Sequence, residues 1–127
     1  MKQKYLVCKH CGNMVAMVKD KGVNVVCCGE KMTELIPGSV DASFEKHIPE
    51  YEIKDDKVIV TVGSVIHPML DVHYIEWISI ETTNGAQIVE LKPNDEPKAE
   101  FLLASNEKLV SVYAYCNLHG LWVNKNE

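Results

Sequence analysis

The segment His73–Lys92, HYIEWISIETTNGAQIVELK, decides the fold class of this chain. Its first part, as far as Thr83, is rich in β-branched and aromatic residues that partly alternate with polar ones, a pattern typical of a half-buried strand. This part runs into Asn84-Gly85, a strong short-range signal for a hairpin turn, and a second strand-like run, AQIVELK, follows it. The segment therefore predicts two antiparallel strands joined by a tight turn.

The sequence around this hairpin contains more strand-like segments. These are KVIVTVG at residues 57–63, AEFLLAS at residues 99–105 and KLVSVYAYC at residues 108–116. Pro93 and Pro97 are confined to a loop between strands, and no segment has the pattern of a long amphipathic helix. A mainly β fold is therefore expected, with a sandwich of short antiparallel strands in the C-terminal part.

The first part of the chain has a different composition, with four cysteines, Cys8, Cys11, Cys27 and Cys28, and a boundary signal at Pro37-Gly38. We expect one domain at residues 1–37 and a second at residues 38–127. About 36 residues are too few to build a stable hydrophobic core alone, so the first domain needs a bound metal or another crosslink.

The cysteine spacing indicates a metal site. Cys8 and Cys11 form a C-x-x-C knuckle, whose two thiolates can converge on one metal while Cys27 and Cys28 complete a tetrahedron. Zinc and iron would both suit four thiolates. Adjacent cysteines are not the second knuckle of an ordinary zinc ribbon, however, because neighbouring side chains point in different directions.

Composition and charge exclude several classes of protein. The chain has 127 residues and a net charge of −5, and all 13 of its basic residues are lysines, so nucleic acid is not an expected partner. No run approaches the ~20 apolar residues of a membrane span, and the N-terminus lacks the pattern of a secretory signal. We therefore expect a cytoplasmic protein. In a reducing cytosol thiols stay reduced unless a metal or catalysis uses them, so five cysteines, an odd number, favour metal binding.

A second group of candidate ligands lies in the β-rich part. His47 follows Glu45 and Lys46, His67 and His73 are six residues apart, and Cys116 and His119 form a C-x-x-H pair. Four imidazoles and one thiolate suit a mid-row redox metal better than zinc, which prefers four ligands. If the four nitrogens lie in a plane with the sulfur below it, a sixth position stays open for a small ligand.

Two family resemblances follow from these motifs. The C-x-x-C pair followed by C-C-G resembles desulforedoxin, and EKH, HPM…H and CNLHG resemble superoxide reductase. Together and in this order they resemble desulfoferrodoxin, the two-iron form of that enzyme, over essentially the whole chain. The resemblance implies a small rubredoxin-like or desulforedoxin-like domain followed by an immunoglobulin-like antiparallel β-sandwich related to neelaredoxin.

The resemblance also implies the ligands and the reaction. One iron would be bound by the four N-terminal cysteines, and a second iron by His47, His67, His73, His119 and Cys116. The expected activity is the one-electron reduction of superoxide to hydrogen peroxide, which detoxifies reactive oxygen. Lys46 would attract superoxide, and Glu45 would occupy the sixth position of the ferric form.

The same resemblance implies partners. The expected electron donor is a small redox protein such as rubredoxin, and the expected assembly is a homodimer. Neither membrane nor nucleic acid is an expected partner.

Two other hypotheses stay open on the residues alone. One is an electron carrier, either rubredoxin-like or built as a cupredoxin-like sandwich that uses Cys116, His119 and another histidine. The other is a binding protein whose zinc ribbon docks a partner. The first leaves two histidines unexplained, and the second gives the histidine group no task.

Overall fold

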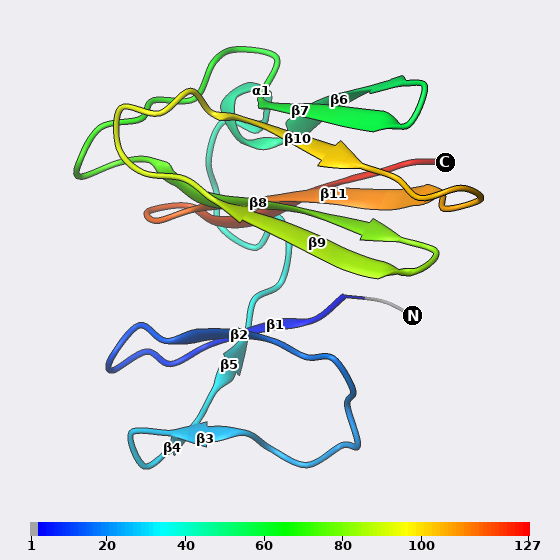
Figure 1. The fold of residues 1–127 in the computed structure, drawn as a ribbon. Helices are drawn as coiled ribbons and strands as arrows, with labels where there is room; N and C mark the ends of the chain where they lie inside the picture. The colour runs from blue at the N-terminus through cyan, green and yellow to red at the C-terminus, as the bar shows by residue number, and fades with distance from the viewer. Residues whose placement is uncertain (1–2) are drawn as a thin grey trace. The chain divides into compact units, whose positions relative to one another are not determined.

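The computed structural model describes residues 3–127, and the chain divides into two compact units, Met1–Ile36 and Pro37–Glu127. Figure 1 shows the strands of both units. The predicted mainly β fold is confirmed, because antiparallel sheets account for the regular structure of both units apart from one short helix. In the described part of the chain, no helix has the length and apolar character needed to cross a membrane.

The N-terminal unit is a set of very short strands. A three-stranded sheet has the order β2-β1-β5, and β3 and β4 form a separate hairpin. Their bounds are Tyr5–Val7 (β1), Met14–Ala16 (β2), Val26–Cys27 (β3), Glu30–Lys31 (β4) and Thr33–Glu34 (β5). The core cluster of this unit has three buried residues, Leu6, Cys8 and Met32. So small a core agrees with the expectation that the unit needs a crosslink.

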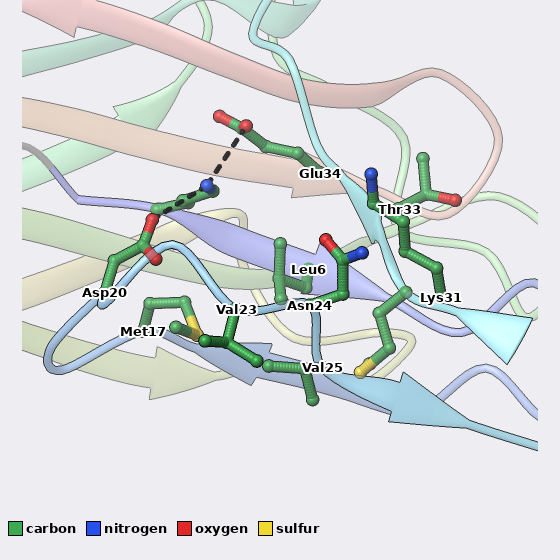
Figure 2. Close-up of a pocket in the computed structure, with 11 residues that line it drawn as sticks. Leu6, Met17, Asp20, Val23, Asn24, Val25, Lys31, Thr33 and Glu34 are labelled. Carbon is green, nitrogen blue, oxygen red and sulfur yellow. Dashed lines mark hydrogen bonds and ion pairs between the residues drawn. The ribbon is translucent and has the colours of Figure 1, made fainter.

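A groove in this unit, shown in Figure 2, is lined by side chains of several of its strands and loops, and none of the four cysteines is among them. Lys4 Nζ lies 2.9 Å from Asp20 Oδ2 and 3.6 Å from Glu34 Oε1. These exposed ion pairs connect the long loop after β2 to β5. Because surface ion pairs contribute only about 0–1 kcal/mol, they do not replace a core.

The C-terminal unit is built from two antiparallel sheets, drawn as two layers in Figure 1. One sheet has the order β10-β7-β6 and the other has the order β12-β11-β8-β9. The strands are Pro49–Lys54 (β6), Lys57–Val62 (β7), Ile75–Thr82 (β8), Gly85–Glu90 (β9), Lys98–Leu102 (β10), Leu109–Cys116 (β11) and Gly120–Lys125 (β12). Both sheets contribute to one core cluster of twelve buried residues, among them Val60, Ile78, Phe101 and Val112.

The predicted hairpin is present, and its turn lies one residue earlier than the sequence signal. Thr82 pairs with Gly85, so Thr83 and Asn84 form the tip and Gly85 begins β9. Side-chain and neighbouring-strand contacts favour this register: Asn84 N–H donates to Thr82 Oγ1 at 3.1 Å, and Thr83 N–H donates to the Lys108 carbonyl at 2.9 Å.

Two strands of the sandwich were not predicted. β6 begins with a proline and is mostly polar, and β12 follows β11 after only three residues. Pairing explains both: every residue of β6 faces a residue of β7, and every residue of β12 faces a residue of β11. Tertiary contacts here outweigh weak local propensity.

Strand register brings the histidine-bearing segments of this unit to one end of the sandwich. Pro49 pairs with Val62, so the start of β6 lies beside the end of β7. Cys116 pairs with both Ile75 and Gly120, so the end of β11 lies beside the starts of β8 and β12. The only helix in residues 3–127, α1 (Phe44–His47), immediately precedes β6.

Candidate metal centres

The four N-terminal cysteines come together in the structure. Their four sulfur atoms all lie within 4.8 Å of one another, and Cys11 Sγ is 3.6 Å from Cys27 Sγ. A tetrahedral site with metal–sulfur bonds of ~2.3 Å has sulfur–sulfur distances of roughly 3.8 Å. None of the cysteines forms a disulfide. The cluster therefore has the dimensions of a four-thiolate metal site.

A hairpin turn explains how two adjacent cysteines reach one cluster. Cys27 ends β3 and pairs with Glu30, so Cys28 and Gly29 form a two-residue turn. Both turn residues have positive φ, 52° at Cys28 and 75° at Gly29, which is the pattern of the hairpin turns that follow the twist of their strands. The left-handed conformation of Cys28 changes the direction of its side chain relative to Cys27.

The pKa values of the cysteines differ within this cluster. Hydrogen bonding from the backbone of Cys11, with that of His10, lowers the pKa of Cys8 to about 6. Hydrogen bonds with the side chains of Cys11, Cys8 and Cys27 raise the pKa of Cys28 to about 12. One thiolate is thus stabilised by the chain, while further ionisation is opposed by the neighbouring sulfurs. A bound cation would allow all four thiols to ionise.

The second cluster lies at the histidine-bearing end of the sandwich. Candidate ligand atoms of His47, His67, His73 and Cys116 all lie within 4.8 Å of one another. His119 joins this group at its side, with Nδ1 at 3.1 Å from His47 Nε2 and 3.8 Å from Cys116 Sγ. The structure therefore brings together the four histidines and the cysteine singled out in the sequence.

Cys116 reaches the cluster from the core. It is fully buried at the end of β11, where the pairing with β8 shifts register between Tyr115 and Cys116. Such an irregularity re-aims a side chain at the end of a strand. Burial raises the pKa of the thiol, and backbone hydrogen bonds from Leu118 and His119 oppose that shift. A metal ion would hold this sulfur as the thiolate.

Two histidine rings are anchored by backbone carbonyls. His47 Nδ1 donates to the Ser43 carbonyl at 2.7 Å, and His67 Nδ1 donates to the Pro68 carbonyl at 2.7 Å. Because a carbonyl oxygen can only accept, these bonds place the ring protons on Nδ1 and leave Nε2 with its lone pair. Anchoring of this kind is the usual outer partner of a metal-bound histidine.

The arrangement of nitrogen atoms inside the cluster fits a metal ion. His67 Nε2 lies 3.2 Å from His47 Nε2, so two lone pairs face each other. His73 Nε2 is buried and has no hydrogen-bond partner in residues 3–127. Burial lowers the pKa of His67 to about 4, so its ring is neutral near pH 7. A cation among these nitrogens would satisfy all three atoms.

The two charged residues before His47 are exposed, and the structure distinguishes them. The Lys46 charge contributes, after burial and the neighbouring histidines, to lowering the pKa of both His47 and His73, so it acts on the cluster. The Glu45 carbonyl accepts hydrogen bonds from Val65 N–H at 2.9 Å and Ser64 Oγ at 3.2 Å, which hold the backbone of α1. Within the described residues, the Glu45 carboxylate makes no hydrogen bond or ion pair with the cluster.

Sequence reasoning missed several residues that support this cluster. The Trp122 ring lies 5.2 Å from the His47 ring, and its indole N–H donates to the His119 carbonyl at 3.0 Å. Gly63 packs against α1: a Cβ there would lie 2.6 Å from the Glu45 carbonyl oxygen. Asn117, between Cys116 and His119, binds the segment that carries His73. Asn117 lies inside the CNLHG motif.

Comparison with known proteins agrees with this arrangement. The sequence profile of the desulfoferrodoxin family matches residues 39–125. A desulfoferrodoxin homolog of Archaeoglobus fulgidus is 47% identical over 91% of this chain and 90% of its own length. A superoxide reductase of Pyrococcus horikoshii is 36% identical over 68% of this chain and 90% of its own length.

Similarity extends to a solved structure. The superoxide reductase of Treponema pallidum superimposes with a TM-score of 0.84 at 35% identity, covering 98% of this chain and 100% of that one.

Fold and clusters together define a class, that of mainly β proteins with a four-cysteine metal site and a separate histidine–cysteine metal site, consistent with two iron centres. Within that class, the chain belongs to the desulfoferrodoxin family.

Proposed function

We propose that this protein is a superoxide reductase, an oxidoreductase that combines superoxide, one electron and two protons into one molecule of hydrogen peroxide. The observation that carries the proposal is the convergence of four imidazoles and one thiolate at one end of the sandwich. Superoxide reductases are among the relatives and structural neighbours of this chain. Iron bound there would supply the electron and would be reduced again by an external donor.

We assign His47, His67, His73, His119 and Cys116 as the ligands of this iron. Support comes from the inward lone pairs of His47 and His67, the unpartnered Nε2 of His73 and the burial of Cys116. Neutral imidazoles and one thiolate would leave a ferrous ion with one net positive charge, which favours the approach of an anion.

Lys46 and Glu45 are proposed to act where superoxide approaches the histidine–cysteine cluster. An ammonium group near the cluster attracts superoxide locally, although the net charge of −5 repels anions at long range. Lys46 is also proposed to hold a water that delivers a proton. Glu45 is exposed beside it and is proposed to occupy the sixth position in the ferric form, after rotating toward the cluster.

The four-cysteine group, Cys8, Cys11, Cys27 and Cys28, is proposed to bind a second iron, and zinc would fit the same four thiolates. We propose residues 1–37 as a desulforedoxin-like domain and residues 38–127 as the superoxide reductase domain.

A small redox protein such as rubredoxin is the proposed electron donor, and the proposed assembly is a homodimer. Free cysteines favour a location in the cytoplasm.

The alternative is an electron carrier without catalysis. A blue-copper site needs two histidines and one cysteine, so it would leave two of the four clustered histidines without a task. The clustering of all four therefore favours the enzyme.

Product stoichiometry tests the proposal. The protein, loaded with iron and supplied with a reducing donor, would be exposed to a superoxide flux while hydrogen peroxide and oxygen are both measured. A reductase yields one peroxide for each superoxide consumed and no oxygen. Equal amounts of peroxide and oxygen, formed faster than in a protein-free control, would identify a dismutase instead, and superoxide decay at the rate of the protein-free control would identify a carrier.

A further inference from the structure

The side chain of Asn117 connects two of the segments that form the histidine–cysteine cluster. Its Oδ1 accepts a hydrogen bond from Tyr74 N–H at 2.9 Å, and its Nδ2 donates to the Val72 carbonyl at 3.1 Å. The Asn117 N–H also donates to the Tyr74 carbonyl at 3.2 Å. All three bonds therefore go to the two residues on either side of His73.

Compared with His47 and His67, His73 depends more on its backbone for the orientation of its ring. The rings of His47 and His67 are each held by a carbonyl oxygen. The Nε2 atom of His73 is buried without a partner in the described chain. Its main chain forms a small bridge with Leu70, at 2.9 and 3.0 Å. The position of the ring therefore follows from where the segment around His73 is held.

That segment has little apolar packing of its own. Leu70 is 59% exposed and Val72 is 74% exposed, so burial does not define the position of the loop between them. Asn117 directly follows Cys116 and lies two residues before His119 in sequence, and its three hydrogen bonds tie the loop to the turn that carries those two residues. Hydrogen bonds, rather than hydrophobic contact, make this connection.

We propose that Asn117 is a positioning residue that sets the place of His73 relative to Cys116 and His119. The proposal rests on the metal site assigned above and deepens it. Outer partners of this kind govern how tightly a metal is held, because they decide how much the ligands must rearrange to bind it. The bonds from Asn117 would keep His73 in its binding position in the absence of metal.

The test compares two asparagines with the same number of side-chain bonds. Asn126 accepts a hydrogen bond from Tyr51 OH at 2.7 Å and donates to the Leu109 carbonyl at 3.1 Å, and it lies beyond the end of β12 that is remote from the cluster. Asn117→Ala and Asn126→Ala would be prepared in the two-iron protein. The measurements are the rate of iron loss to a ferrous chelator, the thiolate-to-iron absorption after oxidation, and Tm.

We expect Asn117→Ala to lose iron from the histidine–cysteine site about tenfold faster than the unmodified protein and to shift the thiolate absorption. Asn126→Ala should lower Tm, but its rate of iron loss should stay within about twofold of that of the unmodified protein. The absorption of the four-cysteine centre should stay unchanged in both variants. Equal rates in the two variants, or an Asn117→Ala protein with unchanged rate and absorption, would overturn the proposal.

A second variant covers the case in which Asn117→Ala does not fold. Asn117→Asp keeps the acceptor for Tyr74 N–H and loses the donor to Val72. It should release iron faster than the unmodified protein, and an unchanged rate would also overturn the proposal. Because iron retention is measured without superoxide, a protein that binds iron but lacks reductase activity would refute the proposed function alone.

Discussion

The two metal clusters are built in opposite ways. The four cysteines lie on two short turns, two of them are exposed, and the adjacent core cluster has only three buried residues. His47, His67 and Cys116 are buried at the end of a sandwich whose core cluster has twelve. In the first unit a bound metal would stabilise the fold, whereas in the second unit the fold positions the proposed ligands before any metal binds.

Several hydrogen bonds at the two clusters differ in a similar way. At the cysteine cluster they are directed toward sulfur: Asn13 N–H donates to Cys11 Sγ at 3.4 Å, and Asn13 Nδ2 donates to Cys27 Sγ at 3.7 Å. At the histidine cluster, the anchoring bonds of His47 and His67 go outward to carbonyl oxygens. The first pattern stabilises negative charge on the ligands, and the second fixes ring orientation.

Removal of both metals should therefore have very different effects on the two units. Treatment with a strong chelator should unfold residues 3–36, because their core is too small to compensate for the loss of chain entropy. The sandwich should stay folded. Amide hydrogen exchange would show full loss of protection in β1, β2 and β5, with protection retained in β8 and β11. Equal protection of both units after metal removal would show that the first unit does not depend on metal for its fold.

Cys116→Ser should abolish superoxide reduction, since it replaces the buried sulfur of a proposed ligand with a hydroxyl that does not ionise at neutral pH. Activity is expected to fall by at least about a hundredfold, a barrier increase of about 2.7 kcal/mol. The four-cysteine centre should keep its visible absorption, because it lies in the other unit. A variant that retains most of its activity would show that the sulfur is not a ligand.

Gly63→Ala should disturb α1 and with it His47. An added Cβ would lie 2.6 Å from the Glu45 carbonyl oxygen and 2.9 Å from the Ile48 carbonyl oxygen, so the backbone must move. Overpacking of this kind costs typically about 1–3 kcal/mol, and reduced activity should accompany the fall in Tm.

The control for this variant is Ser64→Ala, which removes only the bond from Ser64 Oγ to the Glu45 carbonyl and should lower stability by less than about 1 kcal/mol. If both variants behave like the unmodified protein, the close approach of Gly63 to α1 does not position the site.

Lys46→Ala should have the smallest effect of the four. Loss of one local cation is expected to slow the second-order reaction with superoxide by about tenfold at low salt and to weaken its dependence on ionic strength. Lys57→Ala is the matched control, because it removes the same charge at the opposite end of β7. Identical rates for the two variants at low salt would show that Lys46 does not guide superoxide to the cluster.

Much of the site was predictable from sequence, because ligands must be particular residue types. The spacing of Cys8, Cys11 and the Cys27-Cys28 pair indicated a metal, and the motifs around the histidines led to the second cluster. The positive φ of Cys28 was not predictable, since it depends on the register of β3 with β4. Local propensity likewise missed β6 and β12, whose pairing comes from neighbouring strands.

The supporting residues were the least predictable part. Gly63 acts through the absence of a side chain, Trp122 through one indole N–H, and Asn117 through an amide that bonds to main-chain atoms. Such roles arise from three-dimensional proximity between segments and leave little trace in composition or spacing.

The hairpin of β11 and β12 has a consequence for protein design. Residues 109–125 contain Cys116 and His119 together with Asn117 and Trp122, so one continuous peptide of simple topology holds two proposed ligands and two of their supports. Grafted onto another antiparallel sheet that ends in a comparable register shift, this hairpin would bring a half-formed metal site with it. The new scaffold would need to supply only imidazoles, on loops whose positions can be varied.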